Sequence, residues 1–545
     1  MKKLLMILGT AAALLTLGAN GLEEGFRSPP RSASPHALYH LMNGNVTKEG
    51  ITCDFEALSA AGIGGVQVFD VGCYIPPGPV VFGTPEWFGL MRHVHEEGKR
   101  LGLEVSLRDS SGWSNSGGLW ITPDKAMKVI VAKSAFAKGP SRFHAVLERG
   151  VKDDNGWYED IRVLAFPTPK PGARLTHLSD KTGRTRTRQP LYRALGNHRP
   201  DFLDDPVPPN DRREHPSRDV KEFPPEMVVA KESVIDVTAH MAADGTFDWD
   251  VPAGDWTIMR VGAACNGRCN HPAARGGRGL EVDKLSASAV EHHFNAYAAR
   301  LCDALGIHRR SPKSNVGLTT IHIDSYEVGG QNWTQGLDAV FERRTGRSLV
   351  PFLPVFANRI VGSVAETEDF LECFRRVIAD LFAENYAGTM ARLCHERGLA
   401  FSLEPYGNCV ADDLQYGQDA DTPIAEFWSN AMLGDHGVGG TGNARHAAYL
   451  AHVWGRRRAG AEAFTAHPRN GGCWATTPFS IKGQTDRAYA AGVNCIFYHR
   501  FAHQPWAGNK YLPGMTMGRW GMHFDRTQTW WHIAPEFVTY QARCQ

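Results

Sequence analysis

The sequence has almost no excess of charge of either sign, since 59 Lys and Arg residues stand against 58 Asp and Glu residues in a chain of 545. A nearly neutral chain gives no sign of a nucleic-acid partner or of an anionic membrane surface. The most basic stretch, residues 169–216, has interleaved Asp residues and no aromatic platform, so we interpret it as a solvated surface. The expected partner is therefore a neutral molecule.

The sequence also lacks the common signatures of metal and repeat proteins. Its 11 cysteines are scattered and form no repeated C-x-x-C pairs, so no zinc site is indicated. Cys265 and Cys269 could form a local disulfide or remain two buried thiols. There is no EF-hand loop and no internal repeat, which excludes a calcium site of that type and a solenoid or propeller.

No apolar run after the first residues is long enough to span a membrane. The first residues themselves have Lys2 and Lys3, an apolar run from Leu4 to Leu17 and small residues after it. This pattern predicts a secretory signal peptide over residues 1–21, rather than a membrane anchor, for which the run is short. We therefore expect release into the periplasm or the medium, with no membrane attachment after cleavage.

Short apolar runs alternate with amphipathic helical stretches in two parts of the chain, which is typical of a parallel sheet. Residues 26–126 contain three such strands, and residues 281–545 contain five more. The stretch 127–280 between them breaks the pattern and contains separate β-rich runs. The sequence thus predicts an α/β fold, a (β/α)₈ TIM-type barrel interrupted by an inserted β-rich domain. The predicted barrel strands lie within residues 37–44, 64–72, 103–113, 319–329, 401–407, 425–430, 459–466 and 493–501.

Polar and aromatic residues are concentrated where these strands end, which is where barrel enzymes place their chemistry. Hydrolysis of a glycosidic bond needs two carboxyl groups, and Glu327 and Glu462 follow the fourth and seventh strands. Either glutamate taken alone could equally be a salt-bridge partner. The predicted substrate contacts are His40, Asn43, Asp109, Trp113, Tyr326, Trp333, Tyr406, Trp428, His499 and His503.

Several long blocks resemble the α-L-rhamnosidases of glycoside hydrolase family 106, among them HLMNGNVTKEGITCDFEALSAAGIGGVQVFDVG, GWSNSGGLWITPDKAM, HIDSYEVGGQNWT, EAFT and PGMTMGRWGMHFDRTQTWW. The resemblance implies an interrupted barrel, hydrolysis of terminal α-L-rhamnosides with inversion, and a Ca²⁺ ion that helps to hold the sugar. It also implies a catalytic glutamate at Glu327 with Asp324 beside it, and a second at Glu462. Two alternatives remain: a retaining β-glycosidase with the same two strand positions, and a sugar-binding remnant without catalysis.

Three further expectations follow. Glu327 is predicted to be the general acid, because Tyr326 and Trp333 would bury it and raise its pKa, which leaves Glu462 as the general base. Glu404 and Glu426 on neighbouring strands are candidate Ca²⁺ ligands, although they could equally bind the substrate or an arginine. The sequence ends at Gln545, where the family continues, so we expect the last barrel strand to be partly uncovered and the chain to be less stable than longer relatives.

Overall fold

The computed structural model describes residues 21–176, 178–183, 218–307, 315–406, 411–429, 441–466, 472–508, 510–518 and 521–545. Nearly all of the predicted signal peptide and most of the basic stretch 169–216 lie outside these ranges. Within the part of the chain that is described, no helix combines the length and the apolar character needed to cross a membrane.

Eight parallel strands close into a barrel, as predicted. They are β1 (His36–Met42), β2 (Gly65–Val71), β3 (Glu104–Arg108), β10 (Gly317–Ile323), β11 (Ala400–Leu403), β12 (Thr422–Ser429), β13 (Gly460–Ala466) and β14 (Cys495–Ala502). Their order around the barrel is β1-β14-β13-β12-β11-β10-β3-β2. Each strand is short, apolar and almost continuously buried, because helices cover the outside of the barrel and side chains fill its inside. Every predicted barrel strand is confirmed in its predicted place.

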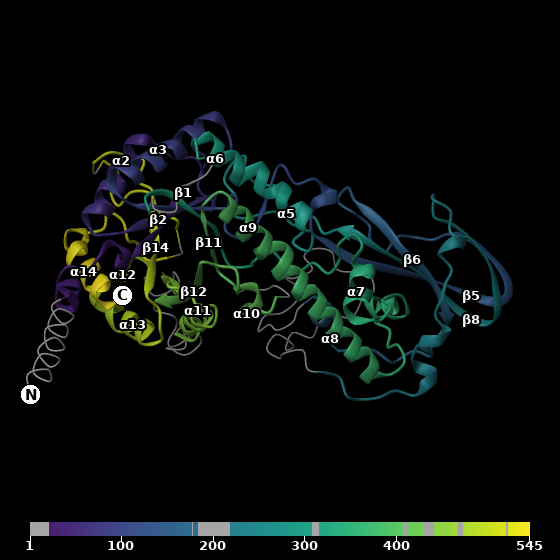
Figure 1. Cartoon of the computed structure of the whole chain (residues 1–545). Coiled ribbons are helices and arrows are strands. Elements are labelled where there is room, and N and C mark those ends of the chain that lie inside the picture. The colour runs from purple at the N-terminus through teal and green to yellow at the C-terminus, as the bar shows by residue number, and fades with distance from the viewer. Residues whose placement is uncertain are drawn as a thin grey trace, which may run out of the picture.

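The helices begin and end at residues that their sequences mark. In α3 (Pro85–Leu101), the Thr84 side chain accepts a hydrogen bond from the Trp87 backbone N–H, Pro85 occupies the first turn, and Gly102 ends the helix in the left-handed conformation. The other helices are α2 (Lys48–Ala60), α4 (Leu178–Gly183), α5 (Ala287–Phe294), α6 (Arg300–Ala304), α7 (Leu337–Thr345), α8 (Val364–Leu381), α9 (Thr389–Glu396), α10 (Asp413–Tyr416), α11 (Thr441–Val453), α12 (Gly472–Ala475), α13 (Pro478–Ala490) and α14 (Ala534–Cys544). Figure 1 shows α2, α3, α13 and α14 around the barrel, with α8 reaching away from it along the molecule.

Between β3 and β10 the chain forms an antiparallel sheet that lies beyond the barrel, at the opposite end of the molecule (Figure 1). Its strands, in the order β5-β8-β6-β7, are β5 (Lys128–Val146), β6 (Tyr158–Pro167), β7 (Ile235–Asp236) and β8 (Thr246–Cys265), and the short β4 (Gly117–Gly118) pairs separately with β9 (Leu280–Glu281). Ile130 and Met259 of this sheet belong to the same buried cluster as Phe370 of α8. Cys265, at the end of β8, and Cys269 are not bridged.

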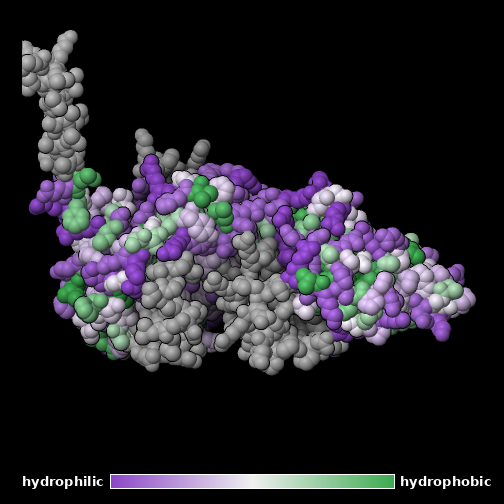
Figure 2. Space-filling view, turned by 90° about the horizontal axis from the view of Figure 1, so that it is seen from below, coloured by the Kyte–Doolittle hydropathy of each residue, from purple (hydrophilic) through white to green (hydrophobic). Residues whose placement is uncertain are grey.

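The last barrel strand is covered by the last helix, contrary to the expectation from the sequence. All residues of β14 are buried. The ring of Tyr498 in β14 lies 6.2 Å from that of Phe537 in α14, measured between centroids. It lies 4.3 Å from the ring of Phe524, in the segment before this helix. The apolar side of this strand is therefore packed rather than exposed. The surface seen in Figure 2 is mainly hydrophilic where it is coloured, with hydrophobic residues scattered singly or in small groups.

Candidate active site

Five carboxylate side chains gather toward the carboxyl ends of the neighbouring strands β10, β11, β12 and β13. Asp324 directly follows β10, Glu327 lies three residues further on, and Glu404 directly follows β11. Glu426 of β12 and Glu462 of β13 are paired in register on neighbouring strands. Because the carboxyl ends of parallel strands open at one rim, these side chains can act on one bound molecule.

Burial and mutual repulsion raise the pKa values of three of these carboxyl groups. Burial, with the charges of Asp324 and Glu462, raises the pKa of Glu404 well above its usual range. Burial, Glu426 and Asp324 do the same to the pKa of Glu462, while burial, Glu327 and Asp324 raise the pKa of Glu426 to about 8. Such a cluster can hold its charge only if a proton, a cation or a substrate group compensates it.

Glu327 is exposed, and its surroundings differ from those predicted. The indole Nε1 of Trp113 donates a hydrogen bond to its Oε2 at 3.0 Å. Tyr326 and Trp333 are only 1% and 3% exposed and belong to the main core. The structure therefore corrects the expectation that these two aromatic residues bury Glu327 or contact the substrate, and the aromatic residue that contacts the Glu327 carboxylate is Trp113.

Glu462 is buried, and a bulge in β13 supplies its hydrogen-bond partner. Residues 462 and 465 of a regular strand would face opposite sides. Here the register with β12 skips Phe464, whose φ is 69°, so Thr465 comes to the same side as Glu462. The Thr465 hydroxyl donates to Glu462 Oε1 at 2.5 Å. The Nδ1 atom of His499 lies 3.8 Å from the same oxygen.

Two buried histidines meet edge to face beside this carboxylate. His40 of β1 stacks on Phe69 with ring centroids 4.9 Å apart, and its ring lies 5.4 Å from that of His499 of β14. Burial and the charge of Arg500 lower the pKa of His40 to about 3, and burial together with His40 and Arg500 lowers that of His499 well below its usual value. Both rings are therefore neutral, and their Nδ1 atoms have no hydrogen-bond partner among the described residues. Neutral imidazoles of this kind can bind sugar hydroxyl groups.

Tyr406 and Trp428, two further predicted contacts, are partly exposed near the acidic cluster. The Tyr406 hydroxyl donates to Glu404 Oε2 at 2.6 Å, so it orients that carboxyl group. Trp428 lies in β12, two residues after Glu426. Its side chain hydrogen-bonds Glu426 and favours the ionised form of that carboxyl group.

Three other predicted contacts are occupied by protein partners, which corrects their assignment. Asp109 is buried in an ion pair with Arg108 and also accepts a hydrogen bond from Ser116. Burial would raise the pKa of Asp109, but Arg108, His293 and Ser116 together outweigh it, so the pKa lies below its usual value. His503 is fully buried between Asp54 and Tyr39, at 2.8 and 2.6 Å from their oxygen atoms. Asn43 joins two loops, since its amide donates to the Ile75 carbonyl at 2.6 Å and accepts from the Arg275 backbone N–H at 2.9 Å.

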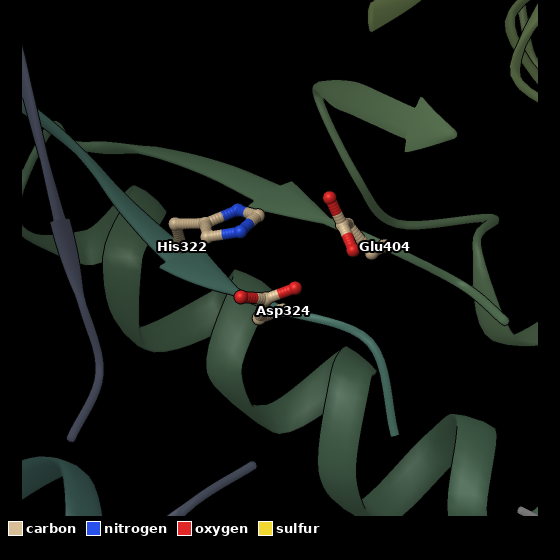
Figure 3. Close-up of side chains that lie close together, drawn as sticks. All are labelled: His322, Asp324 and Glu404. Carbon is tan, nitrogen blue, oxygen red and sulfur yellow. The ribbon is translucent and has the colours of Figure 1, made fainter. Parts of the chain in front are cut away.

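Within the part of the chain that the structure describes, one group of side chains could hold a metal ion. His322, Asp324 and Glu404 each offer one ligand atom, and these atoms lie within 4.8 Å of one another. Figure 3 shows the three side chains turned toward a common space. The two carboxylates fit Ca²⁺, which prefers hard oxygen ligands, whereas the imidazole does not and suits a transition metal better. Glu426, predicted as a ligand together with Glu404, is not part of this group.

His322 was not predicted as a site residue, although the sequence contains a signal for it. It stands two positions before Asp324 in β10, and alternate residues of a strand face the same side. Thr465 could not be found in this way, because only the bulge turns it toward Glu462.

The fold and this site together define a class. A closed parallel barrel with paired carboxyl groups at its carboxyl-terminal rim is the arrangement of the barrel glycoside hydrolases. Residues 27–545 match glycoside hydrolase family 106, described as alpha-L-rhamnosidase, and the chain belongs to this family.

Two relatives add detail. The chain is 38% identical over 526 residues to a curated protein of Formosa agariphila named "Putative beta-glucuronidase", covering 96% of this chain and 41% of that one. A solved structure of a rhamnosidase from Novosphingobium sp. PP1Y is similar with a TM-score of 0.78 and 28% identity, over 96% of this chain and 60% of that one. The chain thus spans less than two thirds of either relative.

Proposed function

We propose that this chain hydrolyses terminal α-L-rhamnosides with inversion of configuration. The observation that carries the proposal is the convergence of Glu327, held by Trp113, and Glu462, held by Thr465, on one acidic rim. Two carboxyl groups, one giving a proton to the leaving oxygen and one activating water, are what inversion requires. Membership of family 106 supports the same reaction.

The depth of the two glutamates supports their roles. The leaving group must depart toward the opening, where the exposed Glu327 can protonate its oxygen. The attacking water must lie on the other face of the sugar, where the buried Glu462 can take its proton. The Thr465 hydroxyl donates to Glu462 and so favours the ionised form that a base needs. Glu327 is then the general acid because of its position, not because of burial.

The electrostatics of the rim favour a neutral sugar over a uronic acid. A glucuronide would bring a sixth carboxylate to a site where repulsion already raises pKa values. The buried guanidinium groups nearby already have partners: Arg108 pairs with Asp109, and Arg500 donates to the Thr516 hydroxyl at 2.5 Å. Rhamnose, a neutral 6-deoxy sugar, adds no negative charge and needs no cation to balance it.

The first prediction concerns substrate and stereochemistry. The purified chain should hydrolyse an aryl α-L-rhamnoside in preference to aryl β-glucosides, β-galactosides and β-glucuronides, because the site is acidic and the two guanidinium groups described beside it, Arg108 and Arg500, already have partners. Proton NMR during turnover should show the β-anomer of rhamnose first. Equal or better hydrolysis of a β-glycoside would reject the substrate, release of the α-anomer would reject inversion, and binding without turnover would indicate a sugar-binding protein.

A Ca²⁺ ion at Asp324 and Glu404 is a further part of the proposal, with Glu426 as an additional candidate. When bound, the ion would supply positive charge and coordination positions for sugar hydroxyl groups. The proposal is supported by the carboxylate oxygens of Asp324 and Glu404, which lie within 4.8 Å of each other. It is also supported by the raised pKa of Glu404, a buried carboxyl group without a compensating charge. Secretion through the signal peptide at residues 1–21 also belongs to the proposal, and the N-terminal sequence of the exported protein tests it.

The second prediction is that activity depends on this ion. Exhaustive chelation should abolish most of the turnover, and Ca²⁺ should restore it, because the carboxylates would otherwise repel one another. Mg²⁺ is the matched control, since it demands a tighter octahedral geometry and should restore less. Undiminished turnover after chelation would remove the metal from the mechanism, and better rescue by Zn²⁺ would point to His322 as a ligand.

A further inference from the structure

The loop after β3 contacts Glu327 at two places. Trp113 donates its indole N–H to Glu327 Oε2 at 3.0 Å, and the carbonyl oxygen of Ser114 accepts the backbone N–H of Glu327 at 3.0 Å. One contact fixes the carboxyl group and the other fixes the backbone that carries it. Both come from adjacent residues, so the position of this loop determines the position of Glu327.

The loop is itself held from behind by residue 271. The His271 carbonyl accepts the backbone N–H groups of Trp113 at 3.0 Å and Ser114 at 2.8 Å. The backbone N–H of His271 donates in return to the Ser114 hydroxyl oxygen at 2.8 Å. Arg108 adds a hydrogen bond from Nη2 to the Trp113 carbonyl at 3.0 Å. Hydrogen bonds from His271 and Arg108 thus hold both Trp113 and Ser114.

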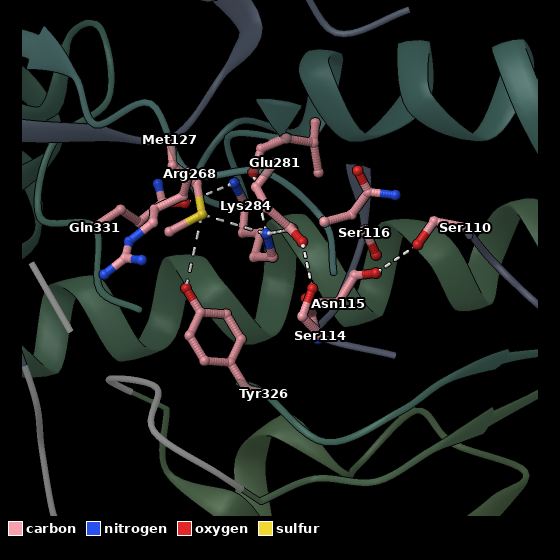
Figure 4. Close-up of polar contacts among 12 residues, drawn as sticks. Ser110, Ser114, Asn115, Ser116, Met127, Arg268, Glu281, Lys284, Tyr326 and Gln331 are labelled. Carbon is pink, nitrogen blue, oxygen red and sulfur yellow. Dashed lines mark hydrogen bonds and ion pairs between the residues drawn. The ribbon is translucent and has the colours of Figure 1, made fainter. Parts of the chain in front are cut away.

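A fully buried ion pair lies below the loop. Glu281 and Lys284 are both 0% exposed, and Lys284 Nζ donates to Glu281 Oε2 at 2.8 Å. The other oxygen, Oε1, accepts the hydroxyl of Ser114 at 3.2 Å. Lys284 Nζ also lies 5.6 Å from the ring centroid of Tyr326, the residue before Glu327. Figure 4 shows Glu281 and Lys284 between Ser114 on one side and Met127 on the other, with Tyr326 facing the same group.

A pair of this kind is poorly explained by stability alone. Removing two charges from water costs so much that apolar replacements of a buried pair are often neutral or stabilising. The two members of this pair contact Ser114 and Tyr326. Ser114 binds the backbone of Glu327, and Tyr326 directly precedes it. A rigid support of the catalytic geometry is a role that apolar side chains could not fill, because only directional bonds fix the Ser114 hydroxyl.

We propose that Trp113 is a positioning residue for the Glu327 carboxyl group, and that Ser114, Glu281 and Lys284 hold it in place. The inference rests on the proposed function, in which Glu327 is the general acid. Because Oε2 accepts the indole N–H, the proton of the acid form is carried on Oε1, which is then the atom that gives it to the leaving oxygen. Trp113 therefore acts on proton transfer and not on sugar affinity, in contrast to its prediction as a substrate contact.

The experiment compares Trp113→Phe with Trp120→Phe on a series of aryl α-L-rhamnosides whose leaving groups differ in basicity. Both variants keep an aromatic ring and lose one N–H, but the Trp120 indole donates to His293 Nδ1 and not to the rim. Trp113→Phe should lower kcat by about tenfold or more on poor leaving groups and much less on activated ones, with KM nearly unchanged, because only poor leaving groups need the acid. Trp120→Phe should leave the leaving-group dependence as it is.

Two further variants keep the test open if Trp113→Phe does not fold, as judged by circular dichroism. Ser114→Ala and the double variant Glu281→Met, Lys284→Met leave the indole in place and remove its support. Both should shift the leaving-group dependence in the same direction as Trp113→Phe. A rise in KM that is equal for all substrates would make Trp113 a sugar contact and overturn the inference, as would an unchanged leaving-group dependence. If the unaltered chain hydrolyses no aryl glycoside at all, the proposed function fails and the inference fails with it.

Discussion

Glu327 and Glu462 occupy contrasting surroundings although they are proposed to act on one bond. Glu327 is exposed at the rim and accepts an indole N–H, whereas Glu462 is buried and accepts a hydroxyl. Burial raises the pKa of Glu462 well above its usual range, so an ionised base there needs compensation by a cation or by the substrate complex. The division of roles is therefore a matter of position and of the bound state, and it can be tested directly.

The third prediction concerns these two residues. Glu327→Gln should slow substrates with poor leaving groups far more than activated aryl substrates, because only the former need a proton. Glu462→Gln should slow both kinds alike, since water must be activated in either case. Each change should lower kcat by at least about a hundredfold on substrates with poor leaving groups.

Steady-state kinetics on both substrate types provide the check. Leaving-group dependence in the Glu462 variant instead would reverse the roles, as the burial of Glu462 alone would suggest. Smaller losses in both variants would reject the pair. The proximity of Glu426, which also has a raised pKa, makes Glu426→Gln an informative third comparison.

At the scale of elements, the packing of α14 on β14 closes the barrel. Phe537 and Val538 of α14 are buried, and Phe537 lies against Tyr498 of β14. Removing such a side chain leaves a cavity next to the strand that carries His499.

The fourth prediction follows from this packing. Phe537→Ala should lower the free energy of unfolding by about 3 kcal/mol or more, through lost burial and the cavity left behind. Glu536→Ala on the exposed side of the same helix is the control and should change it by less than about 0.5 kcal/mol. Denaturant unfolding of both variants measures the difference. Equal stability of the two would mean that α14 is only loosely attached.

At the scale of the whole molecule, the barrel and the antiparallel sheet share one buried cluster. Ile130 and Met259 of the sheet and Phe55 and Val66 of the barrel part belong to it. A smaller separate cluster, with Phe247 and Trp249, lies in the part of the sheet away from this shared core. That residues 127–280 form a domain of their own stays a prediction.

The fifth prediction is that unfolding occurs in one cooperative transition. Because the shared cluster cannot be exposed in one part while it stays buried in the other, calorimetry should give one peak with equal calorimetric and van't Hoff enthalpies. Two separated transitions would instead support an independent inserted domain.

Much of the fold could be predicted because it depends on local patterns. Each barrel strand is a short apolar run between helical stretches, and each is found where that pattern places it. The interruption after β3 was visible because the alternation stops there. The covering of β14 was not, because α14 reaches it through contacts between residues about forty positions apart.

The sequence by itself determined the strand order, because consecutive strands in a βα repeat are parallel neighbours. The strand order in turn places the five carboxylates at one rim. Only the tertiary structure decided what surrounds each of them. Asp109, His503, Tyr326 and Trp333 carry the same chemical groups as the residues at the rim, but ion pairs, hydrogen bonds and core packing engage them elsewhere. A bulge turns Thr465 to Glu462, and a distant loop brings Trp113 to Glu327. The physical reason is that burial and partners depend on three-dimensional neighbours, which local patterns do not specify.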